Sequence, residues 1–166
     1  MGSGTRIGRR SAAGTIIAAW LVAGTLDICA AFVQVYLRGG KNPLIVLNYI
    51  AGAVFGKERA NTGGTPMMVA GLLFHYLAAF LFTLFFYWLY PRVKFFWKNR
   101  IVTALVYGVF VWVVMNLLVV PMTLIAKYPS DPKQAAIAAA ILVVMIGLPL
   151  SLIIGSYYDN KSRSAT

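Results

Sequence analysis

Four long apolar blocks set the limits on what this chain can fold into. Each holds at least 23 residues, and they run over 12–36, 66–90, 101–126 and 135–157. About 20 residues of α-helix are enough to cross roughly 30 Å of hydrocarbon, at about 1.5 Å per residue. A helix also satisfies its own backbone hydrogen bonds inside lipid. The blocks therefore predict an all-α integral membrane four-helix bundle, with residues 1–166 as a single transmembrane domain.

The composition agrees with a membrane protein. Of the residues, 60% are hydrophobic and 11% are charged, which is too little charge for the surface of a soluble domain of this size. The net charge of +11 comes from Lys and Arg at the ends of the apolar blocks, where such residues face lipid headgroups. We therefore expect membrane lipid, and not nucleic acid, as the surrounding partner.

A fifth apolar block, residues 43–55, is too short to cross a membrane. Asn42 and Pro43 form a helix start signal, and Gly56 followed by charged residues forms a stop signal. This block is predicted to be a short interfacial or re-entrant helix in the first outer loop.

Two of the long blocks also begin at recognisable start signals. Thr65 precedes Pro66, and Asp131 precedes Pro132, so each pair places a capping side chain before a proline in the first helical turn. Residues 61–64 are predicted to form a loop that leads into the second span.

The distribution of basic residues predicts the orientation. With four spans, both termini and the loop between the second and third spans lie on one side. That side carries nine Lys and Arg residues: Arg6, Arg9, Arg10, Arg92, Lys94, Lys98, Arg100, Lys161 and Arg163. The other side carries six: Arg38, Lys41, Lys57, Arg59, Lys127 and Lys133. Cytoplasmic loops carry the excess of Lys and Arg, so we expect both termini in the cytoplasm, with residues 159–166 as a short solvated tail.

Three polar residues lie deep in three different spans, and ionisable groups in such positions indicate function by default. Asp27 and Asn116 lie about ten residues, or roughly 15 Å, from the outer ends of the first and third spans. His75 lies roughly 12–14 Å deep in the second span. Asp27 shares its helix face with small residues, which pack against other helices. We expect Asp27 and His75 to form a hydrogen-bonded or ionic pair, with Asn116 nearby.

The same layer also fits a purely structural role. Single buried polar residues fix helix register in other bundles, and Asn often joins helices in membranes. The substitution Asp27→Asn separates the two interpretations, because a structural pair tolerates it with every activity intact.

Two prolines interrupt spans: Pro121 in the third and Pro149 in the fourth. Each lacks a backbone N–H and frees a carbonyl, so both are predicted helix kinks. Kinks accompany movement in transporters, yet rigid membrane helices carry prolines as well.

The outer loop offers a further candidate site. Gly63, Gly64 and Thr65 lead into a helix N-terminus, with Lys57 and Arg59 shortly before them. Exposed amides and positive charge favour a lipid phosphate. A glycine turn explains the same residues without a ligand.

The sequence holds no nucleophile elbow, no HExxH and no P-loop, so we expect no enzyme activity. The single cysteine, Cys29, excludes an internal disulfide and any CxxC site, and we expect neither a metal nor a cofactor.

Two function classes remain. One is a small transporter or channel, homo-oligomeric because four helices enclose little space, with Asp27 and His75 as a proton- or cation-responsive pair. The other is an accessory or assembly subunit that docks onto a membrane partner protein.

Four short stretches carry a resemblance to a known family. They are Gly24-Thr25-Leu26-Asp27, Gly56-Lys57-Glu58, Gly63-Gly64-Thr65-Pro66 and Phe74-His75. With the four-span layout and the size, they resemble small bacterial inner-membrane proteins of the YagU-like kind. The resemblance implies a bacterial inner-membrane location and no particular chemistry.

Overall fold

The computed structural model describes residues 11–125 and 130–164, and every regular element in these residues is a helix. The helices are α1 (Ala12–Leu37), α2 (Ile45–Phe55), α3 (Lys57–Thr62), α4 (Gly64–Leu89), η1 (Tyr90–Arg92), η2 (Lys94–Trp97), α5 (Arg100–Val113), η3 (Val114–Val119), η4 (Val120–Met122), α6 (Pro132–Leu142), η5 (Val143–Gly147) and α7 (Leu148–Arg163).

Within the described residues, four continuous helical stretches are long and apolar enough to cross a membrane. They are Ala12–Leu37, Gly64–Arg92, Arg100–Met122 and Pro132–Arg163. This confirms the predicted all-helical class and the prediction of four helices long and apolar enough to span a membrane. Ala126, the end of the third predicted block, lies outside the described residues, as do Arg6, Arg9, Arg10 and Lys127 of the charge count.

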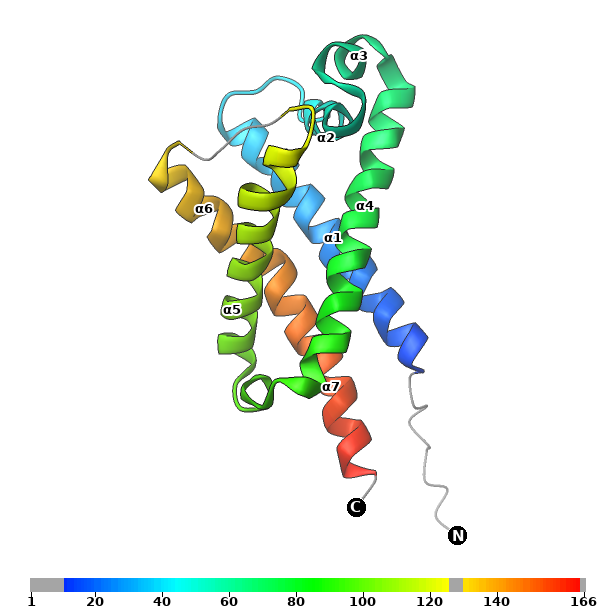
Figure 1. Ribbon diagram of the computed structural model, residues 1–166, viewed down its shortest axis with the longest axis vertical. Helices are drawn as coiled ribbons and strands as arrows, with labels where there is room; N and C mark the ends of the chain where they lie inside the picture. The colour runs from blue at the N-terminus through cyan, green and yellow to red at the C-terminus, as the bar shows by residue number, and fades with distance from the viewer. Residues whose placement is uncertain (1–10, 126–129, 165–166) are drawn as a thin grey trace.

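The long helices alternate in direction, so the bundle has two distinct ends (Figure 1). The first and last described residues and the η1–η2 segment lie at one end, which we call the terminal end. The opposite end holds α2 and α3, and we call it the α2 end. Helix α1 packs against both α4 and α7, and α5 packs against η5 and α7. The first and fourth long helices therefore form the centre, flanked by α4 and α5.

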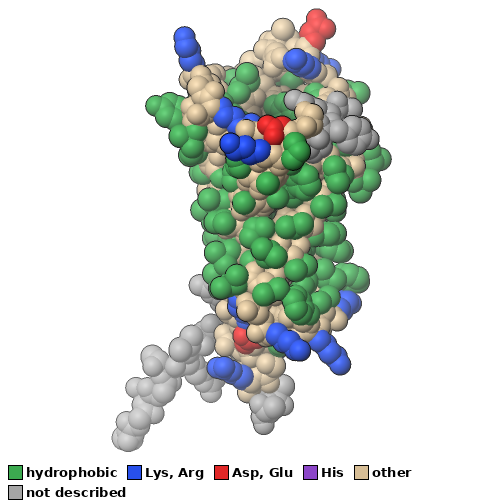
Figure 2. All heavy atoms as spheres, turned by 90° about the vertical axis from the view of Figure 1, so that its left-hand side faces the viewer, with side chains coloured by type: hydrophobic (Ala, Val, Ile, Leu, Met, Phe, Trp, Pro, Cys, Tyr) green, Lys and Arg blue, Asp and Glu red, His purple; other side chains and the backbone are tan. Residues whose placement is uncertain are grey.

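A band of hydrophobic side chains covers the middle of the molecule (Figure 2). Lys and Arg side chains gather above and below this band on the same face. The exposed apolar side chains come from all four long helices and include Leu73, Leu81, Ile101 and Leu105. Such a band between two charged ends is the surface that a bilayer requires.

The helix starts confirm one predicted cap and overturn another. The Asp131 carboxylate accepts hydrogen bonds from the backbone N–H groups of Lys133 and Gln134, and Pro132 is the first residue of α6. The predicted Thr65 cap is wrong, because α4 already begins at Gly64. The predicted loop over residues 61–64 is also wrong. Helix α3 runs to Thr62, and Gly64 turns the chain with a φ of 59°, which glycine adopts without strain.

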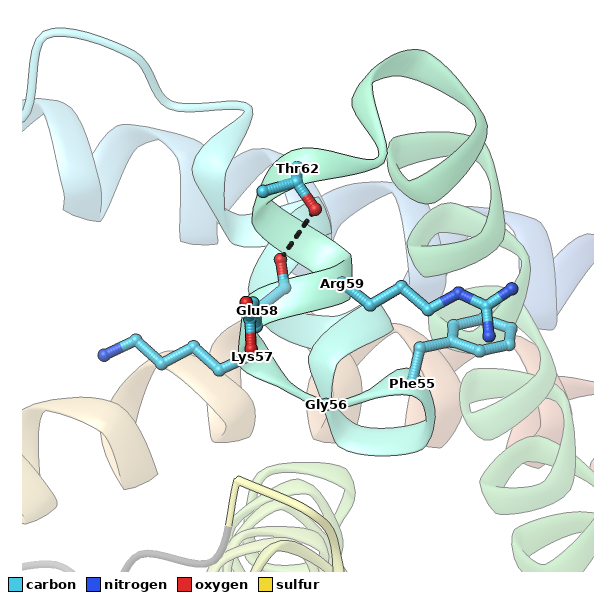
Figure 3. A pocket seen from close by; sticks show the side chains of 6 residues that line it. All are labelled: Phe55, Gly56, Lys57, Glu58, Arg59 and Thr62. Carbon is cyan, nitrogen blue, oxygen red and sulfur yellow. Dashed lines mark hydrogen bonds between the residues drawn. The ribbon is translucent and has the colours of Figure 1, made fainter.

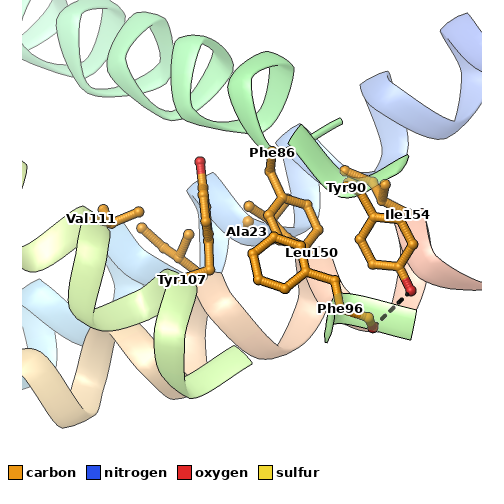
Figure 4. Close-up of a cluster of buried hydrophobic side chains, with 10 residues drawn as sticks. Ala23, Phe86, Tyr90, Phe96, Tyr107, Val111, Leu150 and Ile154 are labelled. Carbon is orange, nitrogen blue, oxygen red and sulfur yellow. Dashed lines mark hydrogen bonds between the residues drawn. The ribbon is translucent and has the colours of Figure 1, made fainter. Parts of the chain in front are cut away.

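Aromatic side chains fill the core toward the terminal end (Figure 4). The rings of Phe86 and Tyr107 lie 4.4 Å apart, between α4 and α5. The Tyr107 hydroxyl donates to the Phe82 carbonyl at 2.6 Å, and the Tyr90 hydroxyl donates to the Phe96 carbonyl at 3.2 Å. Side chains from α4, α5 and η2 thus join where the two flanking helices approach each other.

Two glycines allow helix backbones to approach closely. A Cβ at Gly71 of α4 would collide with the carbonyl of Leu47 in α2, and a Cβ at Gly147 would collide with the carbonyl of Ala104 in α5. Small residues bring membrane helices together in this way. Helix α2 is therefore packed directly onto α4.

Both prolines named as kinks lie next to π-helical segments: Pro121 in the 3-10 helix η4, and Pro149 in the first turn of α7. The six-residue π-helix η3 precedes Pro121, and the five-residue π-helix η5 precedes Pro149. Proline and π-helical turns are the usual causes of sharp helix bends. A functional role for either bend stays a prediction.

Candidate functional site

The imidazole of His75 is fixed against α1. Its Nε2 lies 2.8 Å from the carbonyl oxygen of Gly24. A carbonyl oxygen accepts only, so Nε2 carries the proton in this bond and Nδ1 is the acceptor of the neutral ring. The bond therefore sets both the orientation and the tautomer of His75.

Asp27 lies three residues after Gly24, on the same side of α1, and is partly buried. Its carboxyl group is within electrostatic reach of His75. No hydrogen bond joins Asp27 to another of the described residues. The structure thus brings the acid and the imidazole to the same level of the α1–α4 contact, while the direct pair stays a prediction.

Asn116 has a different partner from the one expected. Its side-chain amide donates to the Trp112 carbonyl at 3.0 Å, one turn earlier in the third long helix. Asn116 also lies inside the π-helix η3, where the backbone pattern of hydrogen bonds changes. Among the described residues, no hydrogen bond connects Asn116 to Asp27 or His75, so its visible role is within its own helix.

Three residues that the sequence did not single out hold α1 and α4 together around His75. The indole N–H of Trp20 donates to the Tyr76 carbonyl at 2.7 Å. The hydroxyl groups of Thr25 and Tyr76 lie 2.8 Å apart. The Tyr76 ring meets the His75 ring edge-on at 5.5 Å. The sequence shows that these side chains carry polar groups within apolar helices. It does not show which of them pair, because that depends on how each helix is rotated about its axis.

At the α2 end, a shallow open hollow of about 470 Å³ lies over α3 (Figure 3). Its lining residues are Phe55, Gly56, Lys57, Glu58, Arg59 and Thr62. The side chains of Lys57 and Arg59 extend in opposite directions, and the Arg59 guanidinium lies 5.6 Å from the centre of the Phe55 ring.

The other members of the predicted phosphate contact lie at the α3–α4 junction. Gly63 separates the two helices, Gly64 begins α4, and Thr65 is exposed. None of these three lines the hollow. The structure therefore does not gather the five residues around one point, and Glu58 lowers the positive charge beside Lys57.

The most extensive polar cluster lies at the terminal end, and it was not predicted from the sequence. Arg100, at the start of α5, donates to the Tyr90 hydroxyl and to the Ser151 carbonyl, the latter at 3.2 Å. It also forms an ion pair with Asp159 of α7 at 2.5 Å. Part of the predicted solvated tail over residues 159–166 is helical, because α7 continues to Arg163, and residues 160–164 are exposed.

Within the described residues, no group of three or more His, Cys, Asp or Glu side chains is close enough to hold a metal ion. The polar layer that the structure shows between apolar helices is centred on the α1–α4 contact at Asp27 and His75.

The fold and this layer define the class: an all-helical protein with four helices long and apolar enough to cross a membrane, and an acid and an imidazole in its apolar middle. Comparison of the chain with protein-family models, curated proteins and solved structures finds no match.

Proposed function

We propose that this chain is an integral protein of the bacterial inner membrane, with both termini in the cytoplasm, and that it works as a small homo-oligomeric transporter or channel. Asp27 and His75 are its proton- or cation-responsive pair. The observation that carries this proposal is the position of His75. Its Nε2 is held 2.8 Å from the Gly24 carbonyl, one helical turn from the Asp27 carboxyl group, within the apolar band.

The pair has two states of low electrostatic cost inside an apolar bundle. In one, Asp27 is protonated and His75 is neutral. In the other, the proton has moved to Nδ1 of His75 and the two groups attract each other as ions. An unpaired charge is costlier than either state in such surroundings. Binding a proton or a cation therefore changes the attraction between α1 and α4.

Flux measurements on the purified protein in liposomes test this proposal. Asp27→Asn and His75→Gln keep the size of each side chain and remove its titration. We expect both to abolish proton- or cation-coupled flux. Cys29→Ser is the matched control, because Cys29 lies two residues from Asp27 and is exposed on the apolar surface of α1. Full flux in both pair variants would exclude the mechanism.

A second function is favoured by the close packing of the terminal end. Three features fix the positions of α4, α5 and α7 relative to one another: the aromatic core, the close helix approach at Gly147 and the Arg100 ion pair. A non-catalytic accessory or assembly subunit needs such a fixed scaffold with an apolar surface for a membrane partner. It tolerates Asp27→Asn, and its partner co-purifies with it from mild detergent.

A further inference from the structure

Two polar side-chain atoms near the α2 end are fully buried and have no hydrogen-bond partner among the described residues. They are Nε2 of Gln34 in α1 and Oδ1 of Asn48 in α2. One is a donor and the other an acceptor. Buried polar atoms in folded proteins are nearly always satisfied, and water is the usual partner where the protein supplies none.

Both residues lie between the Asp27–His75 level and the α2 end. Gln34 follows Asp27 by seven residues, which places it on the same face of α1 about 10 Å farther along the helix. Asn48 follows Leu47, whose backbone packs on Gly71 of α4. Gly71 lies one turn from His75 toward the α2 end. Asn48 is therefore about one helical turn nearer to the α2 end than the imidazole is.

Helix α2 lies across this end of the bundle (Figure 1). One part of it packs on α4 at Gly71. Its later part meets the segment just after the third long helix, where the Leu124 N–H donates to the Ala53 carbonyl at 3.1 Å and Ile125 lies beside Gly52. The Asn48 atom therefore belongs to a short helix that links two long helices, and the Gln34 atom lies near the end of α1 on the same side of the bundle.

We propose that water enters the bundle beneath α2, hydrogen-bonds to Gln34 and Asn48, and forms the route by which a hydrated proton or small cation reaches Asp27. The donor on α1 and the acceptor on α2 each bind water. The water route stands on the geometry of these two residues. Its use by protons or cations rests on the proposed function.

Thiol accessibility tests the route without measuring transport. In a Cys29→Ser background, Gln34→Cys and Asn48→Cys are placed one at a time in the full chain, in lipid nanodiscs that expose both faces. A charged methanethiosulfonate reagent modifies a thiolate only where water is present. Val33→Cys and Leu73→Cys are matched controls, since these side chains are 55% and 65% exposed on the apolar outer surface.

We expect Gln34→Cys and Asn48→Cys to be modified at least about tenfold faster than the two controls. Equal, slow modification of all four would overturn the route. Rapid modification of Asn48→Cys with slow modification of Gln34→Cys would also overturn it, because water would then stop at α2. Rapid modification of both, in a protein that shows no flux, leaves the water route standing and refutes the proposed transport.

Discussion

The guanidinium of Arg100 and the carboxylate of Asp159 lie 2.5 Å apart, although 59 residues separate them in the chain. The pair joins the first residue of α5 to the last part of α7. The Arg100 guanidinium also lies beside Gly155, where any larger residue would displace it. Arg100 thus links α5 to both α7 and Tyr90 at the terminal end.

We expect replacement of Arg100 to destabilise the folded protein more than replacement of its partner Asp159. Arg100→Leu leaves the Tyr90 hydroxyl and the Ser151 carbonyl without this donor, and each lost bond costs on the order of 1 kcal/mol. Asp159 is 45% exposed, so Asp159→Asn loses a solvent-screened interaction of about 0.2–1 kcal/mol. Thermal unfolding in detergent should show the larger fall in Tm for Arg100→Leu. Lys161→Gln, at an exposed position of the same helix, serves as the control. An Asp159→Asn variant less stable than Arg100→Leu would contradict this order.

A larger residue at Gly71 should separate α2 from α4. Its Cβ would collide with a backbone carbonyl, which moves less easily than a side chain. We expect Gly71→Ala to lower stability by about 1–3 kcal/mol, as overpacking does. Gly14→Ala is the control, because its Cβ meets only the Ser11 Oγ at 3.2 Å. Unfolding curves for both variants check the prediction, and equal Tm values would show that α2 is not tightly packed.

The number and approximate bounds of the long helices could be predicted because apolar length alone decides them. The first block was predicted to end at Tyr36 and α1 ends at Leu37. The Asp131 cap was equally readable, since a capping carboxylate and a following proline are local signals. The Thr65 cap failed because Gly64, one residue earlier, already turns the chain.

The side-chain partners could not be predicted in the same way. Whether His75 meets Asp27 or the Gly24 carbonyl depends on a rotation of α4 by a fraction of a turn, which apolar blocks do not encode. The π-helix around Asn116 has no sequence signature, and the Asn116 amide donates to the Trp112 carbonyl of its own helix. Arg100 and Asp159 were read as separate loop and tail charges, because pairing across 59 residues needs the tertiary fold.

Lys57 and Arg59 should contribute separately to binding anionic lipid. Their side chains point in opposite directions, so each meets a different headgroup, and a basic residue near an anionic surface contributes about 1 kcal/mol. We expect Lys57→Gln and Arg59→Gln each to reduce retained anionic lipid, with additive effects in the double variant. Native mass spectrometry counts the bound lipids. Lys133→Gln, exposed at the start of α6, is the control. Loss of all binding in either single variant would indicate one shared site instead.

Substitutions of His75 separate its structural bond from its proposed titration. The amide N–H of His75→Gln can still donate to the Gly24 carbonyl, so we expect stability within about 1 kcal/mol of the parent. His75→Phe keeps a ring of similar shape but loses this donor, and since the Gly24 carbonyl still accepts its bond within helix α1, stability falls by about 0.5–1.5 kcal/mol. Both variants should lose pH-dependent flux in liposomes.

Combining the histidine change with Asp27→Asn measures the coupling within the pair. If the two groups act together, the double variant should be no worse in flux than either single variant, and the stability effects should not add. Unfolding and flux measured on the same four proteins decide this. Additive stability losses, with pH-dependent flux retained in His75→Gln, would reduce His75 to a residue that holds α4 against α1 through the Gly24 carbonyl.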